Sequence, residues 1–246
     1  IATIWETELG DDEQAIEAYQ RVLETDPKHL DSVLALERIY TKLDRWHELL
    51  GVFEIEVQLV PEREEKIKIY HKMASIWEER FADLKKAIAC HEQVLQLDPD
   101  NLSALKALER LVSRQGDYPR LIELYQRHLE LVQGAEKVEI YLAMGEVWHR
   151  ELSRVDKAEE AFSMALKIDP RSRPAMHALG QLYEKSGNWF NALEMLRGEA
   201  ELCGAGPEAV DLYYRMGKIN EDMLLDSQAA RAAYARALEI DPGYLP

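Results

Sequence analysis

A short phrase that ends in Asp-Pro occurs four times along this chain, with nearly constant spacing between the copies. The copies are VLETDP, VLQLDP, ALKIDP and ALEIDP, and they end at Pro27, Pro99, Pro170 and Pro242. Successive prolines are therefore 72, 71 and 72 residues apart. A fixed internal period of this kind is the signature of a repeat protein, in which one supersecondary unit is copied along the chain.

The residues that lead to each Asp-Pro predict an amphipathic helix. Aligned on the proline, the copies start at Ala15, Ala87, Ala158 and Ala230, and their first, fifth, eighth and ninth positions are mostly apolar. This is the i, i+4, i+7, i+8 stripe of a helix with one buried face. The Asp-Pro predicts where the helix ends, because a residue before proline is disfavoured in the α region and proline has no N–H to donate.

Tryptophans recur at corresponding places in the copies. Trp5, Trp77 and Trp148 precede the helical phrase, and Trp46 and Trp189 follow it in their units. A residue that is copied with the repeat is expected to pack within each unit, so we interpret these side chains as packing residues rather than as stacking platforms for a ligand.

Turn-forming residues divide each unit of about 72 residues into four helices, which makes two helical hairpins. A single hairpin cannot bury its apolar stripe alone, so successive hairpins must stack and share a core. The sequence therefore predicts an all-α solenoid of about seven hairpins. We expect one domain over residues 1–246, with units at approximately 1–60, 61–133, 134–205 and, in part, 206–246. The hairpins that end in Asp-Pro carry one more residue in their internal turn than the other hairpins do, since Gly145 is thirteen residues before Ala158 whereas Gly180 is twelve before Ala192.

The stretch ALGQLYEKSGNWFNAL resembles the tetratricopeptide repeat (TPR), whose spacing is matched by Leu179, Gly180, Tyr183, Gly187 and Ala192. The phrases that end in Asp-Pro resemble the second half of the same motif. The resemblance covers essentially the whole chain and is that of a segment of a long, bacterial-type array. It implies a right-handed α-α superhelix whose concave surface is lined by the first helix of each hairpin, where partners usually bind.

Composition and charge exclude several classes of protein. Lys and Arg total 30 against 46 Asp and Glu, a net charge of −16, so a nucleic acid would be repelled by the surface as a whole. No apolar run is long enough to span a membrane. Cys90 and Cys203 have no ligand-like spacing and are expected to be buried thiols. A reducing, cytoplasmic location fits this cysteine usage best.

Motifs that carry chemistry are missing from the sequence. It has no glycine-rich phosphate loop, no G-x-S-x-G and no HExxH, so we predict no catalytic residue, no metal ligand and no cofactor. Asn101 begins a sequon, but its place after Asp-Pro predicts a helix N-cap. The acidic clusters are expected to be helix starts and solvated faces.

A strip of mostly basic residues maps onto the predicted concave face. Its simplest interpretation is a set of ordinary exposed charges. The sharper hypothesis is a groove for an acidic or carboxylate-bearing peptide, anchored by Lys106, Arg110 and Arg114. Acidic Glu78, Glu79 and Glu146 share its rim. The whole strip comprises Arg38, Lys42, His71, Lys106, Arg110, Arg114, His149, Arg150, His177, Gln181 and Lys185.

The function that we predict is a non-catalytic protein–protein interaction scaffold, which binds a peptide or protein segment along its concave face. One alternative is a regulatory array that senses a ligand or peptide, and an isolated, deep pocket lined by aromatic residues would favour it. A second alternative is an RNA-processing helical repeat, which the net charge disfavours. End-to-end self-association through the stacking surfaces is a further way for such a chain to find a partner.

Overall fold

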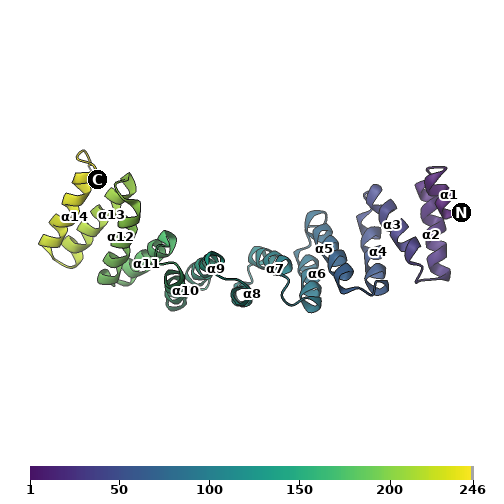
Figure 1. Cartoon of the computed structure of the whole chain (residues 1–246), viewed down its shortest axis with the longest axis horizontal. Helices are drawn as coiled ribbons and strands as arrows, with labels where there is room; N and C mark the ends of the chain where they lie inside the picture. The colour runs from purple at the N-terminus through teal and green to yellow at the C-terminus, as the bar shows by residue number, and fades with distance from the viewer. Residues whose placement is uncertain (245–246) are drawn as a thin grey trace. The chain divides into compact units, whose positions relative to one another are not determined.

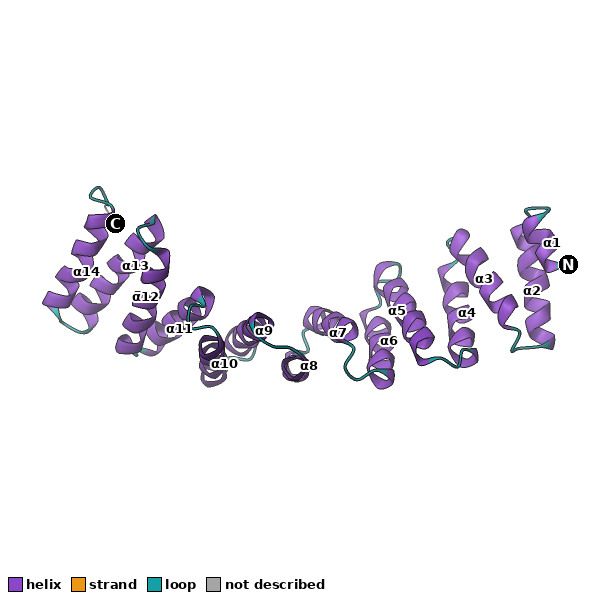
Figure 2. Cartoon of the chain, viewed as in Figure 1, coloured by secondary structure: helices purple, strands orange, loops and turns teal. Residues whose placement is uncertain are grey.

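The computed structural model describes residues 1–244, and all regular secondary structure within them is helical (Figure 2). These residues form fourteen α-helices and two short π-helical segments, which agrees with the predicted number of helices. The chain forms two compact units, Ile1–Asp117 and Tyr118–Pro246, and each is described by itself. The expectation of one continuous domain over residues 1–246 stays a prediction.

The first unit contains seven helices (Figure 1). Each helix packs mainly against the helix that precedes or follows it in the chain, as expected for stacked hairpins. Leu36, Ile39, Leu49 and Phe53 are fully buried in its core. The helices are α1 (Ala2–Thr7), α2 (Asp12–Thr25), α3 (Leu30–Lys42), α4 (Trp46–Leu59), α5 (Arg63–Glu79), α6 (Leu84–Leu97) and α7 (Leu102–Gln115).

The second unit contains the other seven α-helices and both π-helical segments. Its helices also pack mainly in chain order. The elements are α8 (Tyr118–Leu131), α9 (Ala135–Glu146), η1 (Val147–Glu151), α10 (Val155–Ile168), α11 (Arg173–Ser186), α12 (Trp189–Cys203), α13 (Pro207–Lys218), η2 (Ile219–Met223) and α14 (Ser227–Ile240).

The Asp-Pro phrases end helices as the sequence predicts. Helices α2, α6, α10 and α14 each stop at the residue before the aspartate. The aspartate leaves the helical conformation but its N–H still donates to the carbonyl four residues earlier, at 2.7 Å from Asp26 N to Val22 O. The following helix is capped in one copy by Asn101, which accepts from the N–H of Ala104 at 3.0 Å, so the predicted N-cap is confirmed.

The extra residue of the Asp-Pro hairpins lies at a left-handed turn position. Gly10, Ala82, Ser153 and Leu225 have φ angles of 66°, 51°, 52° and 55°. In the second unit this turn follows a π-helical end of the first helix, η1 or η2. A π-turn accommodates one more residue than an α-turn does, whereas in the first unit the same left-handed turn follows α1 and α5 without a π-helical segment.

Two glycines allow the helices of a hairpin to approach each other closely. A Cβ on Gly145 of α9 would lie 2.4 Å from the Phe162 ring of α10, and a Cβ on Gly217 of α13 would lie 2.2 Å from the Tyr234 ring of α14. Phe162 is almost completely buried. The ring therefore packs directly on the backbone of the preceding helix.

The recurring tryptophans are half-buried and pack against the hydrophobic cores. Trp5, Trp46 and Trp77 do so in the first unit, and Trp148 and Trp189 in the second, in agreement with a packing role. Of the two thiols, Cys90 is buried and Cys203 is only half-buried, so the burial expected for Cys203 is wrong. Within residues 1–244, no helix combines the length and the apolar character that a membrane span requires.

Candidate functional site

The predicted cations of α3 form ion pairs with carboxylates of the preceding hairpin. Arg38 Nε lies 2.7 Å from Glu6 Oε1 of α1, and Lys42 Nζ lies 2.7 Å from Asp12 Oδ2 of α2. Both cations stay more than half exposed, so water screens these pairs and each stabilises the fold by less than about 1 kcal/mol. The surface here alternates in charge rather than being uniformly basic.

Two cations share one carboxylate at the contact of α5 with α7. Glu78 accepts two hydrogen bonds from Arg110, one of them from Nη2 to Oε2 at 2.7 Å. It accepts another from Nη1 of Arg114 to Oε1 at 2.6 Å. The hydrogen bond from Arg110 is the main reason that the pKa of Glu78 is lowered. Both guanidinium side chains are about half exposed, at 52%. The three groups carry one positive charge in excess.

His71 turns inward instead of joining this charged surface. Its ring packs against that of His91 on α6, with 5.4 Å between the ring centroids. Burial lowers the pKa of His71, and burial with the nearby cationic groups lowers that of His91 to about 4. Both rings are therefore neutral at pH 7. Lys106 lies on α7 and is exposed.

In the second unit, four residues of the predicted strip meet in one polar pocket. The pocket has a volume of about 150 Å³ and lies where η1 faces α11. His149 and Arg150 line it from η1, and Gln181 and Lys185 line it from α11. Buried Phe162 and Leu182, together with Ala178, provide apolar lining, and Glu146 completes the set.

The polar groups of this pocket are held by short contacts within the unit. Lys185 Nζ donates to His149 Nε2 at 3.3 Å, and Arg150 Nε lies 2.6 Å from Glu146 Oε2. Lys185 and Arg150 share this pocket with a single carboxylate, that of Glu146, so its lysine and arginine exceed its carboxylates by one positive charge. Its ammonium, guanidinium and amide donors suit a carboxylate or a carbonyl oxygen.

His177, the remaining residue of the predicted strip, belongs to a neighbouring network around a buried carboxylate. Its Nδ1 lies 3.2 Å from Glu199 Oε2, and its Nε2 lies 2.8 Å from the Gln181 amide. Glu199 of α12 is only 3% exposed and also contacts Arg173 at 3.3 Å. Its sequence position, on the apolar side of a second helix, gave no signal of this role. The network fixes His177 and orients Gln181 toward the pocket.

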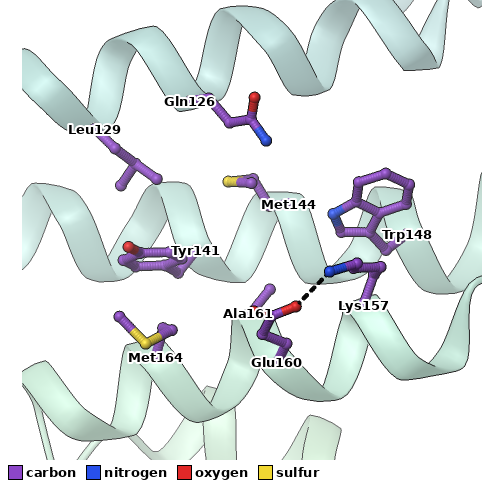
Figure 3. A pocket seen from close by; sticks show the side chains of 9 residues that line it. All are labelled: Gln126, Leu129, Tyr141, Met144, Trp148, Lys157, Glu160, Ala161 and Met164. Carbon is purple, nitrogen blue, oxygen red and sulfur yellow. Dashed lines mark hydrogen bonds and ion pairs between the residues drawn. The ribbon is translucent and has the colours of Figure 1, made fainter.

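A second, apolar groove lies between α8, the α9–η1 helix and α10. Its volume is about 340 Å³. Figure 3 shows Tyr141, Met144 and Trp148 on the central helix, with Leu129 above them and Met164 below. Trp148 is the residue of η1 that precedes His149, so one π-helical segment contributes to both the apolar groove and the polar pocket. Gln126, Lys157, Glu160 and Ala161 complete the lining.

Neither place has the donor set of a metal centre. Within residues 1–244 no group of three or more His, Cys, Asp or Glu side chains could hold a metal ion. The two sites offer binding groups: cationic and amide donors in the first, and aromatic and thioether side chains in the second.

The helices and their packing in chain order define the class of the protein, a helical-hairpin repeat. Models of the tetratricopeptide repeat match residues 32–67, 104–139 and 175–209, and a further one matches residues 1–29. Together these matches cover more than half of the chain. The chain belongs to the tetratricopeptide repeat family, and the fold class predicted from the sequence is confirmed.

Known relatives share parts of this array. The protein CTR9 homolog of Arabidopsis thaliana is 30% identical over 98 residues, which are 40% of this chain and 9% of the relative. A structure of Naa15/Naa10 bound to HypK-THB matches with a TM-score of 0.62 at 17% identity, over 98% of this chain and 36% of that chain.

The C-terminal part of a TPR repeat-containing protein from Cytophaga hutchinsonii matches with a TM-score of 0.56 at 15% identity, over 99% of this chain and 95% of that chain. These structural likenesses support the fold alone. The chain spans less than half the length of the curated relatives that it matches.

Proposed function

We propose that this chain is a non-catalytic interaction array that binds a segment of a partner protein on the surface of its first helices, through carboxylates of that segment. TPR proteins generally mediate contacts between proteins, and the proposal adds the chemistry of the contact. The observation that carries it is the local excess of cationic donors at two places on a chain whose net charge is −16.

The first place is the group formed by Glu78, Arg110 and Arg114. One carboxylate cannot occupy all the donors of two guanidinium groups, since each has five N–H bonds in a planar fork. Both side chains are half exposed, so their remaining donors can reach an incoming carboxylate without breaking the existing pairs. Such charge-assisted, two-bond contacts are the strong ones among hydrogen bonds.

The second place is the polar pocket of His149, Arg150, Gln181 and Lys185. Its 150 Å³ is enough for one side chain or one chain terminus, and too little for a cofactor. Its apolar lining, Phe162 and Leu182, keeps part of the site dry, which strengthens an ion pair formed there. We expect an Asp or Glu side chain, or a terminal carboxylate, to enter it.

Selection from a random peptide library tests the proposal for partners of any sequence. A displayed library of random 12-residue peptides is selected on the immobilised protein, and the affinities of recovered peptides are measured by fluorescence anisotropy. We expect enrichment of Asp and Glu among the recovered sequences. The variants Arg110→Glu/Arg114→Glu and Arg150→Glu/Lys185→Glu should each weaken binding by about tenfold or more, the equivalent of about 1.4 kcal/mol.

The matched control is Arg21→Glu/Lys28→Glu, which changes the net charge by the same amount on exposed residues outside the first helices. Peptides without acidic enrichment, or an equal loss of affinity in the control, would contradict the proposal. Sedimentation of the free protein over a range of concentrations belongs to the same series. A mass that rises with concentration would indicate end-to-end self-association as the competing use of the array.

A further inference from the structure

The apolar groove between α8, the α9–η1 helix and α10 has a chemistry that the charged surface lacks. Its floor is buried Met144 and Ala161, and its walls are half-buried Leu129, Tyr141 and Met164. Thioethers next to aromatic rings make an adaptable surface for apolar ligands. The volume of about 340 Å³ lies within the range of about 300–1,000 Å³ typical of small-molecule pockets.

The N–H donors of the groove gather at one end, while the Tyr141 hydroxyl, which can donate or accept, lies at the other. Figure 3 shows the amide nitrogen of Gln126 and the indole nitrogen of Trp148 both facing the space, whereas Leu129, Tyr141 and Met164 lie toward the other end. Neither of these two side chains donates a hydrogen bond to another residue in the described part of the chain. The ammonium group at this end, that of Lys157, lies 2.8 Å from Glu160 and is neutralised by it.

In a similar groove of the first unit, the side-chain amide donor has a hydrogen-bond partner within the protein. This groove is formed by α2, α3 and α4, and there the amide of Gln20 donates to the hydroxyl of Tyr40 at 2.9 Å. That groove contains no methionine and no tryptophan. The groove of the second unit therefore combines two features, an apolar body and unused donors at one end.

We propose that this groove is a binding site for a small neutral molecule with an apolar body, an aryl ring or a short alkyl chain, and a carbonyl-type acceptor at one end. The body lies against Tyr141, Met144 and Met164, and the acceptor receives the N–H groups of Trp148 and Gln126. The pocket has room for a body of about ten heavy atoms, at about 30 Å³ per water-sized group. The proposal does not depend on the peptide site.

A pair of probes with the same body and different heads tests this site. 4-Phenylbutan-2-one carries a carbonyl acceptor, and 4-phenylbutan-2-ammonium carries, on the same carbon, only donors and a positive charge. Binding is followed by NMR of the protein with carbon-13 in its methionine methyl groups. The methyl signals of Met144 and Met164 should shift saturably with the ketone, that of Met73 in the first unit should not, and the ammonium probe should bind at least about fivefold more weakly, because it cannot accept from Trp148 and Gln126.

Two variants separate the shape of the groove from its donors. Ala161→Leu fills the floor and should abolish the shifts of Met164, with circular dichroism to verify that the protein stays folded. Trp148→Phe keeps an aromatic ring and removes the N–H, so it should weaken the ketone by about three- to tenfold, the loss of one hydrogen bond, and leave the ammonium probe unchanged.

Several outcomes would overturn the proposal: shifts spread over all methionines, equal affinity for both probes, or a folded Ala161→Leu variant that still binds the ketone. Equal weakening of both probes by Trp148→Phe would also overturn it, because the indole would then act only by filling space.

Discussion

Gly145 and Gly217 have little freedom to change, because an aromatic ring of the second helix occupies the place where their Cβ would be. The hairpin formed by α5 and α6 in the first unit has a different pair of residues at these positions. There the residue aligned with Gly145 is Ala74, and the ring aligned with Phe162 is the smaller imidazole of His91. In these three copies the glycines lie under the larger rings and the alanine under the smaller one, whereas in the first copy Ala2 is aligned with Gly145 and Tyr19 with Phe162.

Gly145→Ala should destabilise the protein by about 1–2 kcal/mol. Overpacking a core costs about 1–3 kcal/mol, and the better helix propensity of alanine returns up to about 1 kcal/mol of this. Urea denaturation measures the difference. Gly51→Ala is the matched control, since nothing lies within 4 Å of a Cβ at this position in α4, and it should stabilise. Equal effects of the two substitutions would contradict the packing argument.

Leu225 occupies a left-handed backbone position, and its side chain is too exposed for packing to offset the strain. Its φ is 55° and its side chain is 80% exposed. A left-handed conformation costs a non-glycine residue about 1–2 kcal/mol, so Leu225→Gly should raise the free energy of unfolding by about 0.5–1 kcal/mol after the entropy cost of glycine. The reverse change at the aligned position, Gly10→Ala, should lower it. A chemical denaturation series checks both, and a loss of stability in Leu225→Gly would refute the expectation.

At the scale of the elements, consecutive first helices are joined by pairs of side chains about one hairpin apart in sequence. The separations are 32 residues for Glu6 with Arg38, 35 for Glu37 with Lys72, and 36 for His149 with Lys185. In these pairs the earlier helix presents the acceptor to the later one. Pairs this exposed add little stability, so we interpret them as fixing which groups remain available to a partner.

The packing of α5 on α6 makes the protein sensitive to acid through His91. In the folded protein its pKa is about 4, lowered by burial and then by His71 and Arg110, with Glu78 opposing. The unfolded chain takes up a proton near the ordinary value of about 6.5, so stability is constant above that pH and falls as the pH drops from about 6.5 to about 4. The loss should reach about 3 kcal/mol at most.

His91→Gln checks this expectation, because it removes the titrating group and keeps a polar side chain. Denaturation of both proteins between pH 7.5 and 4.5 gives the difference in slope. The wild-type curve should fall more steeply than that of the variant below pH 6.5. Parallel curves would show that His91 does not control the acid response.

The sequence was sufficient to predict where the helices lie and which faces they bury. It was insufficient to predict how one hairpin is rotated against the next. Proline and the apolar stripes fixed the ends and buried faces of α2, α6, α10 and α14, because both are local properties of the chain. The partners of the predicted cations were not foreseen for Arg38 or Lys185, since these depend on how one hairpin turns against the next. His71 was placed on the exposed face for the same reason, although its ring packs against His91.

The apolar groove was missed for a different reason. Met144, Tyr141 and Met164 read as ordinary members of a buried stripe, and periodicity does not distinguish a filled core from a hollow one. The groove is lined by the small side chain of Ala161 and by Trp148 of the π-helical segment η1, and neither the hollow nor the π-helical segment has a signature in the apolar periodicity. The groove is thus a feature of the second unit that the residue pattern alone does not predict.

At the scale of the whole molecule, the nearest-neighbour packing of the helices predicts that a destabilising substitution affects only the helices next to it. In a repeat array, each hairpin is stabilised by its own contacts and by those to its neighbours, and regions open with different free energies. Gly145→Ala should therefore accelerate amide hydrogen exchange in α9, α10 and α11, which pack in sequence. Amides of α2, α3 and α4 should exchange as in the wild type. Mass spectrometry of peptic fragments measures both regions in one experiment. A uniform acceleration over both units would mean that the chain unfolds as a single cooperative body, and the description by stacked neighbours would then be wrong.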